Sequence, residues 1–293
     1  MSEPRADPDL NHLRPRLIRL AYRMLGSVAE AEDVVQDAYV RWLATDSDKV
    51  RQPAALLHTI VTRLCLNELK SARRRRETYV GPWLPEPIVE TREAYADDLT
   101  LPLMLALERL SPLERAAFLL HDVFGMDFAE VGAAIGREAA ACRKLASRAR
   151  EHVHAARPRF PVSKEQGSRL AAAFFAASRN GDMEGLRALL AEDVTAYADG
   201  GGKVPATPYP VVGVEAVLAR HARLAGDFAR APSILAGYVE IDGLPGFVTM
   251  EDGGVLQATA LQVEEGKVTA IYVIRNPDKL RHLRAGSGTW REP

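Results

Sequence analysis

Basic and hydroxyl side chains recur on one side of a segment near the middle of the chain, DFAEVGAAIGREAAACRKLASRAR at positions 127–150. The spacing predicts two short helices around Gly136, whose apolar residues share one core: Phe128, Val131, Ile135, Cys142, Leu145 and Ala149. The second helix then presents Arg143, Lys144, Ser147 and Arg148 to solvent. Such groups bind phosphates and base edges, which favours a DNA-binding helix-turn-helix. The alternative is an ordinary helical hairpin with a basic solvent face.

A second basic surface is expected on the segment PAALLHTIVTRLCLNELKSARRRR at positions 53–76. On this predicted helix, Arg63, Asn67 and Lys70 lie on or near one side, and a run of arginines from Arg73 and Arg74 to position 76 follows. Phosphate contacts position a protein on nucleic acid, and contacts to exposed bases give specificity. We interpret the arginine run as phosphate-binding and Asn67 as a polar contact to bases. The alternative for Asn67 is a helix cap or a core hydrogen bond.

An acidic face is predicted on the helix VAEAEDVVQDAYVRWLA, for which Ser27 is the expected N-cap. Asp33 and Asp37 are four residues apart and therefore share a face, with Gln36 beside them. This face suits a basic partner helix, and a solvated acidic surface is the alternative. Tyr39 and Trp42 are candidates either for the domain core or for interface anchors.

Composition limits the possible classes of protein. The chain has 293 residues, a formal net charge of −1 and 47% hydrophobic residues, enough for two or three domains. Cys65 and Cys142 both fall on apolar helical positions, which predicts reduced core residues rather than a disulfide or a metal site. The polar N-terminus is not typical of a signal peptide, and no apolar run approaches the ~18 residues of a membrane helix. We expect a cytoplasmic protein with no cofactor, no metal and no membrane partner.

The pattern divides the chain into four parts. Residues 10–76 and 101–158 are predicted to be all-α, the second with Ser111 and Pro112 starting its leading helix. Residues 77–100 are the expected linker, because the prolines of GPWLPEP (81–87) exclude a regular helix. Residues 165–284 are predicted to form an α+β domain with a curved antiparallel sheet. Its expected elements are helices over 168–190 and 214–228, followed by strands punctuated by Asp-Gly and Glu-Gly turns.

Three segments together resemble the extracytoplasmic-function (ECF) class of sigma factors in the sigma-70 family. AEDVVQDAYVRWL (31–43) is similar to the helix that family members dock on polymerase, LLHTIVTRLCLNELKSARRRR to the −10-binding helix, and the 127–150 segment to the −35-binding helix-turn-helix. The resemblance implies a transcription initiation factor with region 2 at 10–76 and region 4 at 101–158. One departure is Glu138, where the family more often has Ser or Thr as the cap of the recognition helix.

Additional motifs resemble a subgroup with a fused C-terminal SnoaL-like domain, which is cone-shaped: GPWLPEP, AACRKLASRAR, DGGGK (199–203) and NPDKLRH (276–282). That resemblance implies regulation in cis, in which the C-terminal domain acts on the linker. The implied contact residues are Trp83, Leu84, Pro85, Glu86 and Pro87 in the linker, and Asp199, Gly200, Gly201, Gly202, Lys203, Asn276, Pro277, Asp278 and Lys279 in the domain.

The same resemblance implies the partners. These are core RNA polymerase, through the β′ clamp helices bound by Asp33, Gln36 and Asp37 and through the β flap, and promoter DNA. The −10 element would meet Arg63, Asn67, Lys70, Arg73 and Arg74, and the −35 element would meet Arg143, Lys144, Ser147 and Arg148. The free protein is expected to be a monomer, and a small-molecule effector in the C-terminal pocket is possible.

Two other functions remain open. A helix-turn-helix repressor or activator with a ligand-sensing domain would bind duplex DNA without polymerase, as a dimer at a palindrome. A SnoaL-like cyclase or isomerase would need acid/base residues, for which Asp199, His221, Asp242 and Asp252 are candidates. Asp199 lies in the Gly-rich turn DGGGK, which suits a contact loop better than a catalytic site. We therefore expect no catalytic residues and no enzyme activity.

Overall fold

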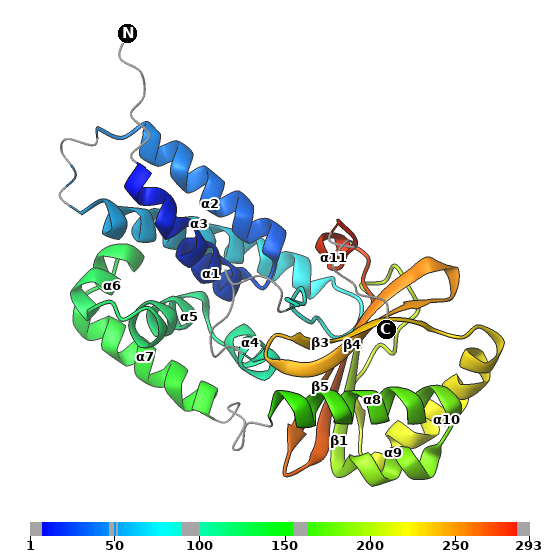
Figure 1. Cartoon of the computed structure of the whole chain (residues 1–293). Helices are drawn as coiled ribbons and strands as arrows, with labels where there is room; N and C mark the ends of the chain where they lie inside the picture. Colours follow the sequence, from blue (N-terminus) through cyan, green and yellow to red (C-terminus); the bar gives the residue numbers. More distant parts are fainter. Residues whose placement is uncertain (1–7, 47–49, 51, 90–99, 155–162, 286–293) are drawn as a thin grey trace. The chain divides into compact units, whose positions relative to one another are not determined.

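The computed structural model describes residues 8–46, 50, 52–89, 100–154 and 163–285. The chain forms two compact units, Met1–Glu77 with Leu103–Arg157, and Thr78–Pro102 with Pro158–Pro293 (Figure 1). The expected fold class, two all-α parts followed by an α+β domain with a curved sheet, is confirmed. The residues between the first two helical parts belong to the second unit.

The first helical part of unit 1 contains the 3-10 helix η1 (Pro8–Leu13) and the helices α1 (Arg14–Leu25), α2 (Val28–Leu43) and α3 (Pro53–Glu77). The Ser27 side chain accepts a hydrogen bond from the Glu30 amide, so the predicted N-cap of α2 is present. Apolar residues at helical spacing pack α1, α2 and α3 on one another, with Leu17, Val35 and Leu57 fully buried.

The second helical part contains α4 (Leu101–Glu108), α5 (Pro112–Phe118), the π-helical segment η4 (Leu119–Val123), α6 (Phe128–Ile135) and α7 (Ala139–His154). Ser111 and Glu114 cap the start of α5 reciprocally, each side chain bonding the other residue's backbone N–H. The buried Arg115 side chain ties this part to the first, because it forms an ion pair with Glu108 at 2.7 Å and donates to the Met24 carbonyl at 2.6 Å. Burial lowers the pKa of Arg115 to about 10.

Unit 2 packs helices against one face of a six-stranded sheet with the order β2-β1-β6-β5-β4-β3 (Figure 1). The helices α8 (Lys164–Asn180), α9 (Met183–Leu189) and α10 (Val214–Arg230) contact strands β1 and β4, and α11 (Arg281–Ala285) follows the last strand. The strands are β1 (Leu190–Asp199), β2 (Val211–Val212), β3 (Ile234–Ile241), β4 (Leu244–Glu251), β5 (Val255–Glu264) and β6 (Lys267–Ile274), with the 3-10 turn η5 (Asp252–Gly254) between β4 and β5.

Two expectations for unit 2 need correction. The single helix predicted over 168–190 is divided, because Gly181 adopts the left-handed conformation (φ 70°) and ends α8 before α9 begins. The sheet is not wholly antiparallel, since β1 pairs with β6 in parallel. A parallel pair needs a long crossover, which the chain from β2 through β5 provides. The predicted turns are confirmed: Asp242-Gly243 and Glu265-Gly266 all have positive φ, as tight hairpins require.

The described residues contain two free cysteines, Cys65 and Cys142, and both are buried. Burial raises the pKa of each thiol, so both are inert core side chains. The described residues include no cluster of three or more side chains able to hold a metal ion. They also include no helix with the length and apolar character needed to cross a membrane.

Candidate functional site

The candidate −35-binding motif is a helix-turn-helix formed by α6 and α7. Asp127 and Glu130 form a reciprocal cap at the start of α6, and Gly136 ends it with φ 68° and a bond from its N–H to the Gly132 carbonyl. A Cβ at Gly132 would lie 2.5 Å from the Arg137 carbonyl oxygen, so the close turn requires glycine there too. These short-range features fix the angle between the two helices.

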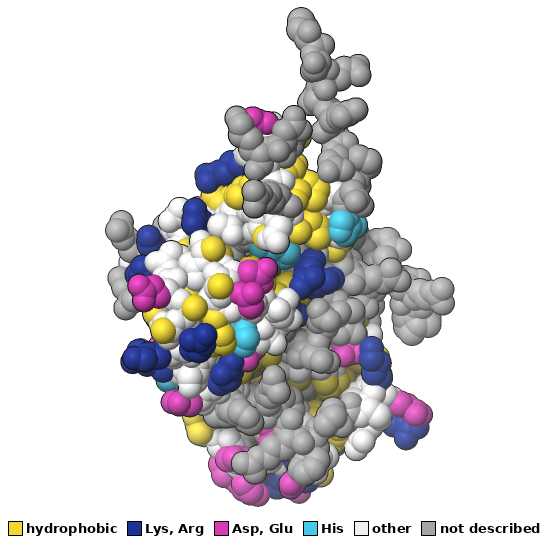
Figure 2. All heavy atoms as spheres, turned by 90° about the vertical axis from the view of Figure 1, so that its left-hand side faces the viewer, with side chains coloured by type: hydrophobic (Ala, Val, Ile, Leu, Met, Phe, Trp, Pro, Cys, Tyr) yellow, Lys and Arg dark blue, Asp and Glu magenta, His cyan; other side chains and the backbone are white. Residues whose placement is uncertain are grey.

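The predicted DNA-facing residues of α7 are all exposed: Arg143, Lys144, Ser147 and Arg148. Figure 2 shows several Lys and Arg side chains on the face of the molecule that carries α6 and α7. The Arg143 guanidinium carbon lies 5.7 Å from the centre of the Phe128 ring, a cation–π distance that orients this side chain. Glu138 is exposed immediately before α7.

The predicted core of this motif is partly wrong. Phe128 and Leu145 are only half-buried, and the tightly packed face of α7 instead consists of Cys142, Ala146, Ala149 and Val153. These positions follow an i, i+4, i+7, i+11 spacing, which places Leu145 at the edge of the apolar stripe. The small alanines allow α7 to pack closely on α5.

The candidate −10-binding residues Arg63, Asn67 and Lys70 are exposed on one side of α3. The Arg63 side chain donates to two backbone carbonyls at the end of α6, those of Ala133 at 2.9 Å and Ala134 at 3.2 Å. The last carbonyls of a helix lack intrahelical partners, so a guanidinium is well suited to them. Arg73 and Arg74 belong to α3, but the side chains of 71–77 lie outside the described part of the structure.

One hollow within unit 1 is bordered by residues from both candidate DNA-binding surfaces. It has a volume of about 670 Å³, and its lining includes Arg63, Asn67 and Lys70 of α3 with Leu145 and Arg148 of α7. In this arrangement the proposed −10 and −35 surfaces therefore face the same space.

The predicted polymerase-binding residues Asp33, Gln36 and Asp37 are exposed on α2. Val40 and Leu43, with 60% and 62% exposure, continue the same exposed surface toward the end of the helix. Of the two aromatic candidates, Trp42 is buried, and Tyr39 is half-buried with its hydroxyl donating to the Leu10 carbonyl at 2.7 Å. The exposure of Val40 and Leu43 was not predicted, because exposed aliphatic residues have no distinct signal in a periodic pattern.

The linker contacts the C-terminal domain at Asp199, whose carboxylate is completely buried. From the linker, the Tyr79 hydroxyl donates to Asp199 Oδ1 at 2.5 Å and the Leu84 amide donates to Oδ2 at 2.9 Å. From the domain, the Gly201 amide and Lys279 Nζ donate to the same carboxylate at 3.1 and 2.7 Å. A buried carboxylate needs several donors, and here linker and domain each provide two.

Lys279 completes this contact. Its ammonium also donates to the Leu84 carbonyl and lies 4.2 Å from the Trp83 ring centre and 4.8 Å from the Tyr79 ring centre. The Asn276 side chain donates to the Tyr79 hydroxyl at 2.8 Å. Burial and the neighbouring Asp199 carboxylate raise the pKa of Tyr79, so this phenol remains a hydrogen-bond donor.

A second contact centres on Asp242 in the β3–β4 turn. Asp242 exchanges backbone hydrogen bonds with the linker, donating to the Ile88 carbonyl at 2.9 Å and accepting from the Leu101 amide at 3.0 Å. Its carboxylate also accepts from the Ile88 amide at 3.3 Å. His282 Nε2 lies 2.8 Å from the Pro87 carbonyl oxygen, within hydrogen-bond distance. Tyr79 and Asp242 are contact residues that the sequence did not predict, whereas His282 lies in the NPDKLRH motif.

The other predicted contact residues lie around these two centres. Pro85 and Pro87 are buried, and Glu86 and Pro277 are half-buried. Gly200, Gly201 and Gly202 form the turn after β1, and a Cβ on Gly201 would lie 2.2 Å from the Asn276 side-chain nitrogen. Lys203 forms an ion pair with Asp278, which also pairs with Arg281 at 2.5 Å. Lys203 and Asp278 thus stabilise the domain side of the contact.

The four acid/base candidates are not brought together. Asp199 and Asp242 bind the linker, whereas His221 and the exposed Asp252 line a separate cavity of the C-terminal domain. Burial, reinforced by Arg220 and Arg179, lowers the pKa of His221 to about 4. His221 is therefore neutral near pH 7.

Comparisons with known proteins agree with this arrangement. The Sigma-70 region 2 model matches residues 10–75, and the Sigma-70, region 4 model matches residues 100–153. The ECF RNA polymerase sigma factor SigJ of Mycobacterium tuberculosis is 40% identical, over 91% of this chain and 90% of that protein. A probable ECF sigma factor, SigI of the same species, is 32% identical over 94% of each chain.

The similarity extends to three dimensions. The crystal structure of Mycobacterium tuberculosis SigJ superposes with a TM-score of 0.74 at 36% identity, covering 93% of this chain and 97% of that one. Both helical regions and the C-terminal domain are included in the matched length. The chain therefore belongs to the ECF RNA polymerase sigma factors.

Proposed function

We propose that the C-terminal domain controls this sigma factor in cis by holding the linker between its two DNA-binding regions. As an alternative sigma factor, the chain directs core RNA polymerase to promoters. Within that function, α3 would recognise the −10 element and α7 would recognise the −35 element. The exposed face of α2 would bind the β′ clamp helices of the polymerase, and region 4 would bind the β flap. The proposed place of action is the cytoplasm. The observation that carries the regulatory proposal is the fully buried Asp199, which linker and domain share.

Separation of the two DNA-binding regions is the central requirement. The −35 and −10 promoter elements are named for positions roughly 25 base pairs apart. This separation corresponds to on the order of 80 Å at ~3.4 Å per base pair. In unit 1, by contrast, the Arg63 side chain of α3 bonds directly to carbonyls of α6 at 2.9 and 3.2 Å. The arrangement of unit 1 is therefore a closed one, and recognition of a whole promoter requires α3 and α6 to separate.

The linker contact limits that separation. Asp242 bonds both Ile88 and Leu101, so one residue holds both of these linker positions. Thirteen peptide steps join these residues in sequence, and a released segment of that length could extend up to about 45 Å. Release of the Asp199 contact would free additional linker from Tyr79 onward. The state of the contact thus sets how far the two regions can move apart.

Run-off transcription with core polymerase tests both levels of this proposal. The unmodified full-length chain is compared with the variants Lys279→Met and Lys267→Met. Lys279→Met removes the ammonium group that contacts the Leu84 carbonyl and the Trp83 ring, and Lys267→Met is the matched control. Lys267 is exposed in the same domain, where it donates to the Ala188 carbonyl. We expect Lys279→Met to raise promoter-specific output and Lys267→Met to leave it unchanged.

The possible results distinguish the alternatives. Transcription that does not depend on the chain, together with binding of duplex DNA as a dimer without polymerase, would favour an ordinary helix-turn-helix regulator. If Lys279→Met supports promoter-specific transcription at or below the level of the unmodified chain, the sigma-factor function stands. The proposed restraint by the linker contact would then be wrong. Retained far-UV circular dichroism and polymerase co-purification verify that each variant is folded.

A further inference from the structure

The C-terminal domain contains a cavity that neither the linker contact nor DNA binding uses. It lies between α8, α10 and the sheet, with a volume of about 290 Å³. Its apolar walls include Phe174, Phe228 and Phe247 from three different elements, with Leu224 and Ile271 beside them. The volume is about twice that of the ~150 Å³ engineered cavity that holds one benzene molecule. A ligand of roughly ten to fifteen non-hydrogen atoms would fill it.

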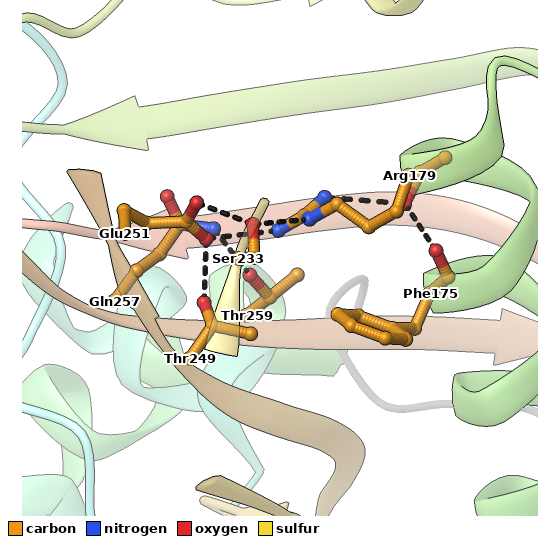
Figure 3. A network of polar contacts seen from close by, with 8 residues as sticks. Phe175, Arg179, Ser233, Thr249, Glu251, Gln257 and Thr259 are labelled. Atoms are coloured by element: carbon orange, nitrogen blue, oxygen red, sulfur yellow. Dashed lines mark hydrogen bonds and ion pairs between the residues drawn. The ribbon is translucent and has the colours of Figure 1, made fainter. Parts of the chain in front are cut away.

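One charged network inside the cavity is already satisfied. Arg179 donates to Glu251 at 3.0 Å and to Ser233 at 2.8 Å (Figure 3). Glu251 is buried and Ser233 is half-buried. Its guanidinium carbon also lies 4.1 Å from the Phe228 ring centre. The Thr249 and Ser233 hydroxyls donate to the remaining lone pairs of Glu251. Glu251 is therefore committed to Arg179.

Two further arginines line the same cavity without an equivalent partner. Among the described residues, no carboxylate lies within ion-pair distance of Arg220 on α10 or of Arg275 at the end of β6. Arg275 donates to the Pro205 carbonyl at 2.8 Å, and its buried Nε has no hydrogen-bond partner. His221, only 9% exposed, likewise has an Nδ1 without a partner. Buried polar groups of this kind are normally hydrogen-bonded, so these atoms are available to a ligand.

The electrostatics of the cavity are positive as a result. Burial and repulsion from Arg275 and Arg223 lower the pKa of Arg220. Burial also lowers the pKa of Arg275, and the attraction of Glu251 offsets only part of this effect. The remaining acidic groups do not compensate: Asp227 pairs with Arg230 at the surface, and the exposed Asp252 accepts the Gly253 amide at 2.8 Å. Four arginines and three carboxylates line the cavity, which leaves an excess of one positive charge. Because Arg230 is paired with Asp227, the remaining guanidinium groups of Arg179, Arg220 and Arg275 face the buried Glu251 and the exposed Asp252.

From this geometry we infer that the cavity binds a small organic carboxylate with an apolar, preferably aromatic, body. The carboxylate would receive paired N–H bonds from Arg220 and Arg275, and its body would pack on the phenylalanine walls. A neutral molecule of the same shape would leave both guanidinium groups unpaired. An inorganic anion would leave the apolar walls empty, so both parts of the ligand are required.

Isothermal titration calorimetry with the full-length chain tests this site. The probes are 1-naphthoate, 3-phenylpropionate and octanoate, with 1-naphthamide as the uncharged match to the first. We expect saturable 1:1 binding of at least one carboxylate, and binding of 1-naphthamide that is about 10- to 100-fold weaker than that of 1-naphthoate, as expected for loss of one charge-assisted contact.

Paired arginine variants locate the binding. Arg220→Gln should weaken carboxylate binding by a similar factor, whereas Arg223→Gln should not, because Arg223 is exposed on the same helix and does not line the cavity. No saturable heat from any carboxylate, equal affinities for 1-naphthoate and 1-naphthamide, or equal effects of the two arginine variants would each overturn the inference. The comparison of acid with amide uses the unmodified protein, so it stands even if Arg220→Gln fails to fold.

Discussion

Substitution of Asp199 by Asn is the most direct perturbation of the linker contact. The change keeps the shape of the side chain but replaces one acceptor oxygen by an NH₂ donor. That NH₂ cannot accept from the four donors that surround Asp199, which are Tyr79, Leu84, Gly201 and Lys279. At least one donor is left unpaired, and the others lose their charged acceptor.

The magnitude follows from the two bonds that cross from linker to domain. A hydrogen bond to a charged group contributes about 1.5–3 kcal/mol, and one to a neutral amide contributes about 0.5–1.5 kcal/mol. Loss of one such bond and weakening of the other makes opening of the linker easier by about 3 kcal/mol. Because 1.4 kcal/mol corresponds to a factor of ten, the open population should rise roughly 100-fold.

Native-state hydrogen exchange measures this population directly. GPWLPEP contains three prolines without an amide hydrogen, so the amides of this segment are those of Gly81, Trp83, Leu84 and Glu86, with Ile88 just beyond. The Leu84 amide, which donates to Asp199, should exchange about 100-fold faster in Asp199→Asn. Asp182→Asn is the matched control, because Asp182 caps α9 away from the linker and Asn caps a helix equally well.

Two outcomes would refute the reasoning. A Leu84 amide that exchanges less than about threefold faster would mean that Asp199 contributes little to linker closure. Equal acceleration in the linker and in the β5 and β6 core would mean that the substitution unfolds the whole domain rather than releasing the linker.

Other parts of the chain give further testable expectations. Arg143→Ala should weaken −35-dependent transcription while polymerase binding persists, and loss of co-purification with polymerase would contradict that role. Ser111→Ala should lower the free energy of unfolding of unit 1 by about 1 kcal/mol, measured by urea denaturation, because it removes the capping box at α5. His221 has a pKa near 4 when folded against an ordinary 6.5, so the unfolded chain binds more protons between these values. Stability should therefore fall by about 3 kcal/mol as the pH decreases from 6.5 to 4, and His221→Gln should flatten this dependence in denaturant titrations at several pH values.

Local features of this fold were predictable from sequence because they depend on neighbouring residues. Ser27, Ser111 and Gly136 occupy the cap positions that their side chains or backbone freedom favour. The same holds for the Asp242-Gly243 and Glu265-Gly266 turns. The fold class followed from periodicity, and the family resemblance assigned the order of the domains.

Long-range contacts were not predictable in the same way. Tyr79 and Asp199 are 120 positions apart, and Arg63 and Ala134 are 71 apart, so no spacing rule connects them. Asp242 was a reasonable acid/base candidate by residue type alone. Its position in a hairpin turn that faces the linker, which only packing determines, makes it an anchor instead.

The linker contact and the cavity meet at the end of β6. Arg275 and Asn276 both donate their backbone N–H to the Asp199 carbonyl, at 2.8 and 2.9 Å. The Arg275 side chain lines the cavity, while the Asn276 side chain donates to Tyr79 of the linker. Two adjacent side chains on one backbone segment therefore serve the two sites. If a bound carboxylate draws Arg275 into the cavity and shifts the end of β6, the same shift moves Asn276. Carboxylate binding then changes the equilibrium between the bound and released linker. By thermodynamic reciprocity, release of the linker must change the carboxylate affinity by the same factor.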